Sequence, residues 1–262
     1  QEQLLDGYNR QPGEKEKEEF LNDPLTIDFA QIEKLYEASK KAKDFSESKI
    51  EPIEFVDKSK LSKEEYAKYE KIGTEKIKEG KLAVVTMAGG QGTRLGHTGP
   101  KGTYDLGLDS HKSIFEILTD TLNEARKKYG VDIPWYIMTS EENNEATVNF
   151  FKEHKFFGYP ESVVTFFKQG KLPMLSTDGK VLLNEEGKIK EAADGHGGIF
   201  QSMLKDGVIY DMKSRGIEWV FIGGVDNVLV NMVDDVLIGL AEEKHVLAAG
   251  KSIVKAGPKE KV

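Results

Sequence analysis

A glycine-rich stretch offers the clearest chemistry in the sequence. It reads AGGQGTRLG over residues 88–96 and directly follows the short apolar run LAVVTM. Glycines let the backbone approach a ligand closely, and consecutive backbone N–H groups can then hold phosphate oxygens. Arg94 adds a planar, permanently charged guanidinium, and Lys101 adds a second cation that can reach the same group. The combination predicts a phosphate-binding loop rather than an ordinary surface loop.

Two familiar glycine motifs do not fit this stretch. The dinucleotide fingerprint G-x-G-x-x-G fits at Gly90 and Gly92, but it places Leu95 where the third glycine belongs. The P-loop pattern G-x-x-x-x-G-K-[ST] fits in no register. These mismatches argue against a nicotinamide-dependent oxidoreductase, which is one alternative class for a chain of this kind.

A candidate metal ligand follows a different apolar run. Asp226 comes directly after WVFIGGV, at the carboxyl end of an expected strand. A carboxylate at that place can hold Mg²⁺ against phosphate groups. The alternative is that Asp226 and Asn227 only shape a turn. We expect Asp226 to bind the metal.

Apolar runs and helical periodicity predict the elements that position these residues. The expected strands cover residues 82–87, 133–138, 163–167 and 219–222. The expected helices cover residues 26–40, 113–129, 140–154, 199–204, 208–213 and 236–243, and a further helix starts at Ser62 with Glu65 completing a capping box. A hairpin is expected in MLSTDGKVLL, with Asp178 and Gly179 as its turn. The charged residues 11–20 are interpreted as a solvated loop or helix face.

The alternation of strands and helices predicts an α/β fold with a mostly parallel sheet flanked by helices, in a Rossmann-like arrangement. Such sheets bind ligands at the carboxyl ends of their strands, near a switch in strand order. We expect an N-terminal helical appendage over residues 1–79 and a catalytic domain over residues 80–262.

The composition limits the classes of function. The chain has 262 residues, of which 38% are hydrophobic and 31% charged, and its net charge is -8. An acidic chain is repelled by nucleic acid and by anionic membranes, so neither is an expected partner. The absence of cysteine excludes disulfides, cysteine-based zinc sites and thiol nucleophiles, and it fits a cytoplasmic protein. No apolar run reaches the ~18–20 residues of a membrane helix.

The glycine-rich stretch, followed by Pro100-Lys101-Gly102, resembles the signature of the UTP-dependent sugar 1-phosphate uridylyltransferases. Further stretches are similar to the UDP-N-acetylglucosamine pyrophosphorylase branch of that family: TYDLGLDSHKSIFEI, IPWYIMTS, FFKQGKLPM, DGHGG and VDNVLV. The resemblance covers about residues 82–262 and includes IDF at residues 27–29. It implies a nucleotidyltransferase fold. Because the family runs further than Val262, the domain is expected to be incomplete at its C-terminus.

The resemblance implies roles for the residues of the loop. The backbone near Ala88, Gly89 and Gly90 is expected to meet the uracil of the nucleotide. The phosphates are expected to be surrounded by Gly92, Thr93 and Arg94. Two cations are the expected catalytic residues: Arg94, for charge on the leaving pyrophosphate, and Lys101, for phosphate in the transition state.

Later residues complete the implied site. Gln169 is expected to read the uracil edge, because a side-chain amide offers both a donor and an acceptor. Gly195 is expected to lie against the nucleotide, and His196 against the sugar. The N-acetylglucosamine branch usually has asparagine in place of His196, and Gly-His-Gly is more similar to the UDP-glucose branch. Asp226 is expected to hold Mg²⁺, the one expected cofactor.

The expected activity is the transfer of uridylyl from UTP to N-acetylglucosamine 1-phosphate, which gives UDP-N-acetylglucosamine and pyrophosphate. The expected partners are therefore UTP and a sugar 1-phosphate, and the sequence carries no signal for an oligomeric state. Two alternatives stay open. His196 favours glucose 1-phosphate as the sugar, and the early end of the chain favours a non-catalytic fragment that binds nucleotide sugars.

Overall fold

A computed structural model describes residues 1–41, 49, 51, 53–257 and 259–260 of the chain. These residues form two compact units. The smaller unit combines residues 1–55 with residues 169–198, and the larger unit combines residues 56–168 with residues 199–262. The units do not coincide with the division expected at residue 80, because residues 56–79 group with the sheet and residues 169–198 group with the N-terminal helices.

The larger unit is built on a parallel sheet with the strand order β3-β2-β1-β6. The strands are β1 (Leu82–Met87), β2 (Trp135–Thr139), β3 (Val164–Lys168) and β6 (Trp219–Gly224). Its α-helices are α4 (Lys63–Lys78), α5 (Ile114–Tyr129), α6 (Asn144–Glu153), α7 (Ile199–Lys205), α8 (Val208–Ser214) and α9 (Asp235–Glu243). Short 3-10 turns cover Lys58–Lys60, Thr93–Leu95, Lys101–Thr103, Lys155–Gly158 and Glu161–Val163. The expected α/β fold with a parallel sheet is confirmed.

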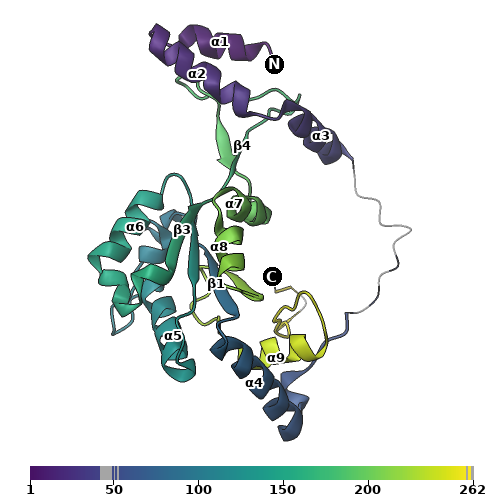
Figure 1. Cartoon of the computed structure of the whole chain (residues 1–262). Helices are drawn as coiled ribbons and strands as arrows, with labels where there is room; N and C mark the ends of the chain where they lie inside the picture. The colour runs from purple at the N-terminus through teal and green to yellow at the C-terminus, as the bar shows by residue number, and fades with distance from the viewer. Residues whose placement is uncertain (42–48, 50, 52, 258, 261–262) are drawn as a thin grey trace. The chain divides into compact units, whose positions relative to one another are not determined.

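Helices cover both faces of this sheet, as Figure 1 shows, with α5 and α6 on one side and α7 and α8 on the other. Successive side chains of a strand point to opposite faces, and the core follows that alternation. On β1, Leu82 and Val84 belong to the cluster that includes α5 and α6, while Ala83 and Val85 belong to the cluster that includes α7 and α8. Burial on both faces explains why β1 reads as one continuous apolar run.

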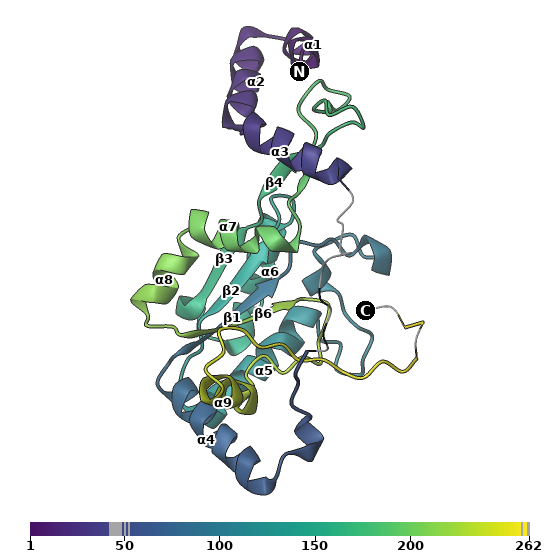
Figure 2. The same ribbon diagram turned by 90° about the vertical axis from the view of Figure 1, so that its right-hand side faces the viewer.

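Helices α4 and α9 lie side by side in both views (Figures 1 and 2). Glycines make the close approach possible: a Cβ at Gly73 would stand 1.8 Å from the carbonyl oxygen of Asp235. The Asp235 carboxylate accepts hydrogen bonds from Lys128 Nζ (2.9 Å) and Tyr129 OH (2.8 Å) at the end of α5. Burial raises the pKa of Asp235, but the bonds from Lys128 and Tyr129 outweigh it and hold the pKa below its ordinary value.

The smaller unit joins the N-terminal helices to a hairpin segment. It contains α1 (Gln3–Arg10), α2 (Glu14–Thr26), α3 (Phe29–Lys40), the antiparallel strands β4 (Lys171–Pro173) and β5 (Glu191–Ala193), and a 3-10 turn at His196–Gly198. Tyr36 OH donates to the carbonyl of Thr177 at 2.8 Å, and Gln3 Nε2 donates to the carbonyl of Val181 at 3.0 Å. Side chains of the helices thus bond the backbone of the hairpin segment.

Several helix starts and one turn lie where local sequence patterns predict them. Asp28 caps α3 by accepting from Gln31 N, and Ser62 and Glu65 form the expected capping box of α4. In the expected hairpin, Leu175 and Val181 form an antiparallel bridge around a turn in which Gly179 has φ +83°. The loop interpretation of residues 11–20 is wrong for most of that run, because α2 begins at Glu14; the helix-face interpretation fits it.

Candidate functional site

The predicted loop and Asp226 meet at the switch in strand order. The chain places β2 and β3 successively on one side of β1, and β6 on the other side. In a parallel sheet, a crevice that can hold a ligand forms at the carboxyl ends of the two neighbouring strands where the strand order reverses. The glycine-rich loop leaves β1 after Met87, and Asp226 follows β6 by two residues. The structure therefore brings Ala88–Lys101 and Asp226 to the edge of the sheet where a ligand is expected.

Backbone bonds close the loop onto itself and onto the sheet. The N–H of Ala88 donates to Met138 on β2 at 2.7 Å. The N–H of Gly92 donates to Gly99 at 3.0 Å, and the N–H of Lys101 donates to Gly90 at 3.1 Å. These bonds pair the two arms of the loop around the bridge between Gln91 and Pro100 and give it a defined shape.

A row of backbone donors in this loop lacks a protein acceptor. Within the described part of the chain, no acceptor pairs with the backbone N–H groups of Gly89, Gly90, Gln91, Thr93 and Arg94. Unpaired N–H groups that are close along the chain form an anion-binding arrangement when they face a common space. The loop therefore offers donors of the kind that phosphate and carbonyl oxygens accept.

Small residues let the neighbouring side chains pack under the loop. A Cβ at Gly92 would stand 2.8 Å from the ring of His97, and a Cβ at Gly102 would stand 2.2 Å from the buried ring of Phe115. His97 Nε2 lies 2.8 Å from Thr103 Oγ1, whose hydroxyl donates to the carbonyl of Pro100. His97, which had no expected role, thus connects the arm that carries Arg94 to the turn that carries Lys101.

The two predicted cations stand in different surroundings. Lys101 Nζ lies 2.5 Å from Asp226 Oδ1, and the side chains of the two residues are 25% and 65% exposed. Arg94 is exposed, and no described residue forms an ion pair with it. Its charge is therefore available to a ligand, whereas Lys101 and Asp226 neutralise each other in the free protein.

Asn143 is a site residue that sequence reasoning missed. The residue is 1% exposed, and its side chain donates from Nδ2 to the carbonyl oxygens of Ala88 (3.0 Å) and Gly90 (3.3 Å). Asn143 lies in the polar run SEENN, which looks like an ordinary helix start. Only its position beside the carboxyl end of β2 indicates contact with the loop after β1.

Gln169, Gly195 and His196 form a second group, in the smaller unit. Gln169 Nε2 donates to the carbonyl of Gly195 at 3.1 Å, so the structure brings these two predicted residues together. His196 begins the 3-10 turn that leads to α7. The Asp194 carboxylate fills the space beside Gly198, where a Cβ would stand 2.1 Å from the carboxylate.

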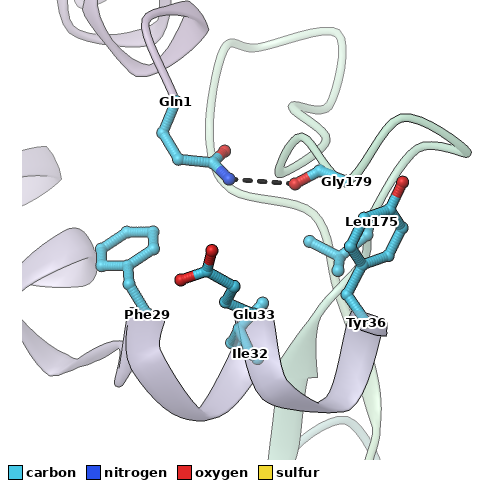
Figure 3. Close-up of a pocket in the computed structure, with 7 residues that line it drawn as sticks. All are labelled: Gln1, Phe29, Ile32, Glu33, Tyr36, Leu175 and Gly179. Atoms are coloured by element: carbon cyan, nitrogen blue, oxygen red, sulfur yellow. Dashed lines mark hydrogen bonds between the residues drawn. The ribbon is translucent and has the colours of Figure 1, made fainter. Parts of the chain in front are cut away.

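The smaller unit also contains a pocket, drawn in Figure 3. It is lined by Gln1, Phe29, Ile32, Glu33, Tyr36, Leu175 and Gly179. Gln1 Nε2 donates to the carbonyl of Gly179 across it, at 3.0 Å. None of the predicted site residues lines this pocket.

Asp226 offers a single carboxylate for a metal. Among the residues that the structure describes, no three histidine or acidic side chains gather into a cluster that could hold a metal ion. Mg²⁺ commonly uses one or two carboxylates and completes its shell with water and substrate phosphates. A lone carboxylate beside a loop with unpaired N–H donors fits that pattern. The same described residues contain no helix long and apolar enough to cross a membrane.

Curated relatives are similar to this chain in sequence. UDP-N-acetylglucosamine diphosphorylase 2 of Arabidopsis thaliana is 39% identical over 262 residues, which cover 95% of this chain and 52% of that protein. The UDP-N-acetylglucosamine pyrophosphorylase of Saccharomyces cerevisiae is 42% identical over 163 residues, 61% of this chain and 34% of that protein. The chain spans about half the length of the curated relative that it matches over most of its own length.

A solved structure agrees with the sequence relatives. The uridine diphosphate N-acetylglucosamine pyrophosphorylase of Trypanosoma brucei, solved in complex with an inhibitor, matches with a TM-score of 0.74 and 27% identity, over 94% of this chain and 52% of that one. A family model described as UTP–glucose-1-phosphate uridylyltransferase matches residues 28–251. The resemblance expected from the sequence motifs is thereby confirmed, and the chain belongs to the UTP–glucose-1-phosphate uridylyltransferase family.

Proposed function

We propose that the loop of residues 88–101 binds the phosphates of UTP, and that the protein transfers uridylyl to N-acetylglucosamine 1-phosphate. The observation that carries the proposal is the row of unpaired backbone donors in a loop that also holds Arg94 and Lys101. Its place at the switch in strand order is where an α/β sheet binds nucleotides. The choice of N-acetylglucosamine as the sugar rests on the relatives that are named for UDP-N-acetylglucosamine.

The reaction needs alignment and neutralisation of charge more than a nucleophilic side chain. A phosphate oxygen of the sugar phosphate attacks the α-phosphorus of UTP. The new P–O bond forms as the bond to the β-phosphate oxygen breaks, and pyrophosphate leaves. Arg94 and the loop N–H groups stabilise the negative charge that collects on the leaving group.

Lys101 and Asp226 have linked roles in this proposal. Their ion pair in the free protein opens when nucleotide enters, because the phosphate oxygens attract Lys101 Nζ and release the Asp226 carboxylate. Asp226 is the residue that would hold Mg²⁺, and the ion would supply charge neutralisation at the phosphates. Asp226→Asn should therefore weaken the dependence of UTP binding on Mg²⁺.

The second group supplies recognition of the base and the sugar. Gln169 Nε2 donates to Gly195, and no donor in the described part of the chain bonds the Gln169 side-chain carbonyl oxygen, so that oxygen can accept from the N3–H of uracil. Gly195 lies against the nucleotide, and His196 bonds the sugar.

A cytoplasmic location is part of the proposal, because a chain without cysteine fits that compartment.

The test is release of pyrophosphate by the chain with UTP, Mg²⁺ and each sugar 1-phosphate in turn. We expect turnover to be highest with N-acetylglucosamine 1-phosphate. A preference for glucose 1-phosphate would support the second candidate, which is motivated by His196. Tight UTP binding without turnover on any sugar phosphate would instead support a nucleotide-binding fragment, in line with coverage of 52% of a relative.

A further inference from the structure

The side-chain amide of Asn143 bonds the backbone through both its nitrogen and its oxygen. Its two Nδ2 bonds end on the carbonyls of Ala88 and Gly90, and its Oδ1 accepts from the N–H of Ser140 at 2.8 Å. The bond from Ser140 fixes which end of the amide carries oxygen, because a backbone N–H can only donate. Asn143 N in turn donates to Ser140 Oγ at 3.2 Å. The two reciprocal bonds with Ser140 hold Asn143 in place at the start of α6.

These two bonds determine where the neighbouring N–H groups point. In a trans peptide, the C=O and the following N–H point in opposite directions. The described peptide bonds are trans, so the carbonyl of Ala88 opposes the N–H of Gly89, and the carbonyl of Gly90 opposes the N–H of Gln91. Because Asn143 holds both carbonyls on its own side, it aims both N–H groups away from itself.

We propose that Asn143 is a positioning residue for nucleotide binding: it orients the N–H groups of Gly89 and Gln91 toward the bound UTP. The inference rests on the proposed binding of UTP by this loop. Lys101 N also donates to the carbonyl of Gly90, so that peptide is held from two sides, whereas Asn143 provides the one side-chain bond to the carbonyl of Ala88 among the described residues. The Gly89 N–H should depend on Asn143 more strongly than the Gln91 N–H does.

A neighbouring residue provides a matched control. Asn144 also stands at the start of α6, and its Oδ1 accepts from Thr139 Oγ1 at 2.7 Å, whereas none of its hydrogen bonds to described residues reaches the loop. Asn143→Ala and Asn144→Ala both remove an amide from the same helix start. A difference between the two variants in nucleotide binding therefore reports the contact with the loop rather than the helix end.

The experiment combines NMR relaxation and UTP binding on the full chain. In the free protein, the ¹⁵N order parameter of Gly89 should be near the rigid value of about 0.85 and should fall in Asn143→Ala. The loss of one to two hydrogen bonds that preorganise the site should raise the Kd for UTP roughly 10-fold in Asn143→Ala. Asn144→Ala should leave both quantities close to those of the unaltered chain.

Asn143→Ser keeps one hydroxyl donor, one atom closer to the backbone than Nδ2, and serves if the alanine variant folds poorly. Its Kd for UTP should fall between those of the unaltered chain and Asn143→Ala. The inference is overturned if the folded Asn143 variants keep the Gly89 order parameter, or if they bind UTP as tightly as Asn144→Ala does. A chain that does not bind UTP at all contradicts the proposed function instead, because the order parameter is measured without nucleotide.

Discussion

Replacement of Lys101 by methionine separates the role of this residue in binding from its role in folding. The change removes the ammonium group and keeps a side chain of similar length. In the free protein the ammonium pairs with Asp226, whose side chain is 65% exposed, so solvent screens the pair. Exposed pairs contribute about 1 kcal/mol or less to the free energy of unfolding. The melting temperature should therefore fall by about 4 °C or less.

The effect on nucleotide binding should be larger. A charge-assisted hydrogen bond from Lys101 to a phosphate contributes about 1.5–3 kcal/mol, which corresponds to a roughly 10- to 150-fold rise in the Kd for UTP. Isothermal titration calorimetry in the presence of Mg²⁺ measures the Kd, and differential scanning calorimetry measures the melting temperature. Lys112→Met is the matched control, because Lys112 pairs with Asp120 at the same 2.5 Å but lies outside the loop.

Two results would refute this reasoning. If Lys101→Met binds UTP as well as Lys112→Met does, Lys101 does not contact the phosphates. If Lys101→Met instead loses far more stability than a screened ion pair can supply, the residue is structural. In that case a weaker affinity reports unfolding rather than a lost contact.

Three further predictions concern other residues. Arg94→Ala should raise the Kd for UTP at least about 10-fold with an unchanged melting temperature, since no described residue pairs with Arg94; unaltered binding would remove it from the site. Tyr159→Phe should cost about 1–3 kcal/mol in urea unfolding, because the Tyr159 hydroxyl bonds both the N–H and the carbonyl of buried Ile133; a cost near zero would contradict this. The pKa of Asp235 is lowered in the folded state, so its contribution to stability is complete above the unfolded pKa of about 3.9 and is lost as the pH falls further; Asp235→Asn should flatten the fall in unfolding free energy below pH 5, and an unchanged slope would count against it.

Local signals carried much of the prediction from sequence. Buried parallel strands lack polar alternation, so LAVVTM was recognisable as a strand without any partner. Helix starts with a side-chain cap could also be predicted, because the capping hydrogen bond joins residues only three positions apart, as at Ser62 and Glu65. The loop of residues 88–101 combines glycines and cations within one stretch, so its residues could be named together as a candidate phosphate site.

Features that join distant segments of the chain could not be predicted from the sequence. The smaller unit pairs the N-terminal helices with residues 169–198 through side-chain bonds such as Tyr36 to Thr177, and no pattern in either segment specifies that pairing. Asn143 donates a hydrogen bond to Ala88, which lies 55 residues earlier in the chain. Both depend on tertiary arrangement, which the periodicity of a single segment does not contain.

A crystal structure of the chain grown with UTP and Mg²⁺ tests the central claim most directly. We predict phosphate oxygens at about 3 Å from the unpaired backbone nitrogens of Thr93 and Arg94 and from Lys101 Nζ, with the Lys101–Asp226 pair open. Nucleotide found in the pocket of Figure 3, with the loop of residues 88–101 empty, would contradict the assignment of this loop as the phosphate site.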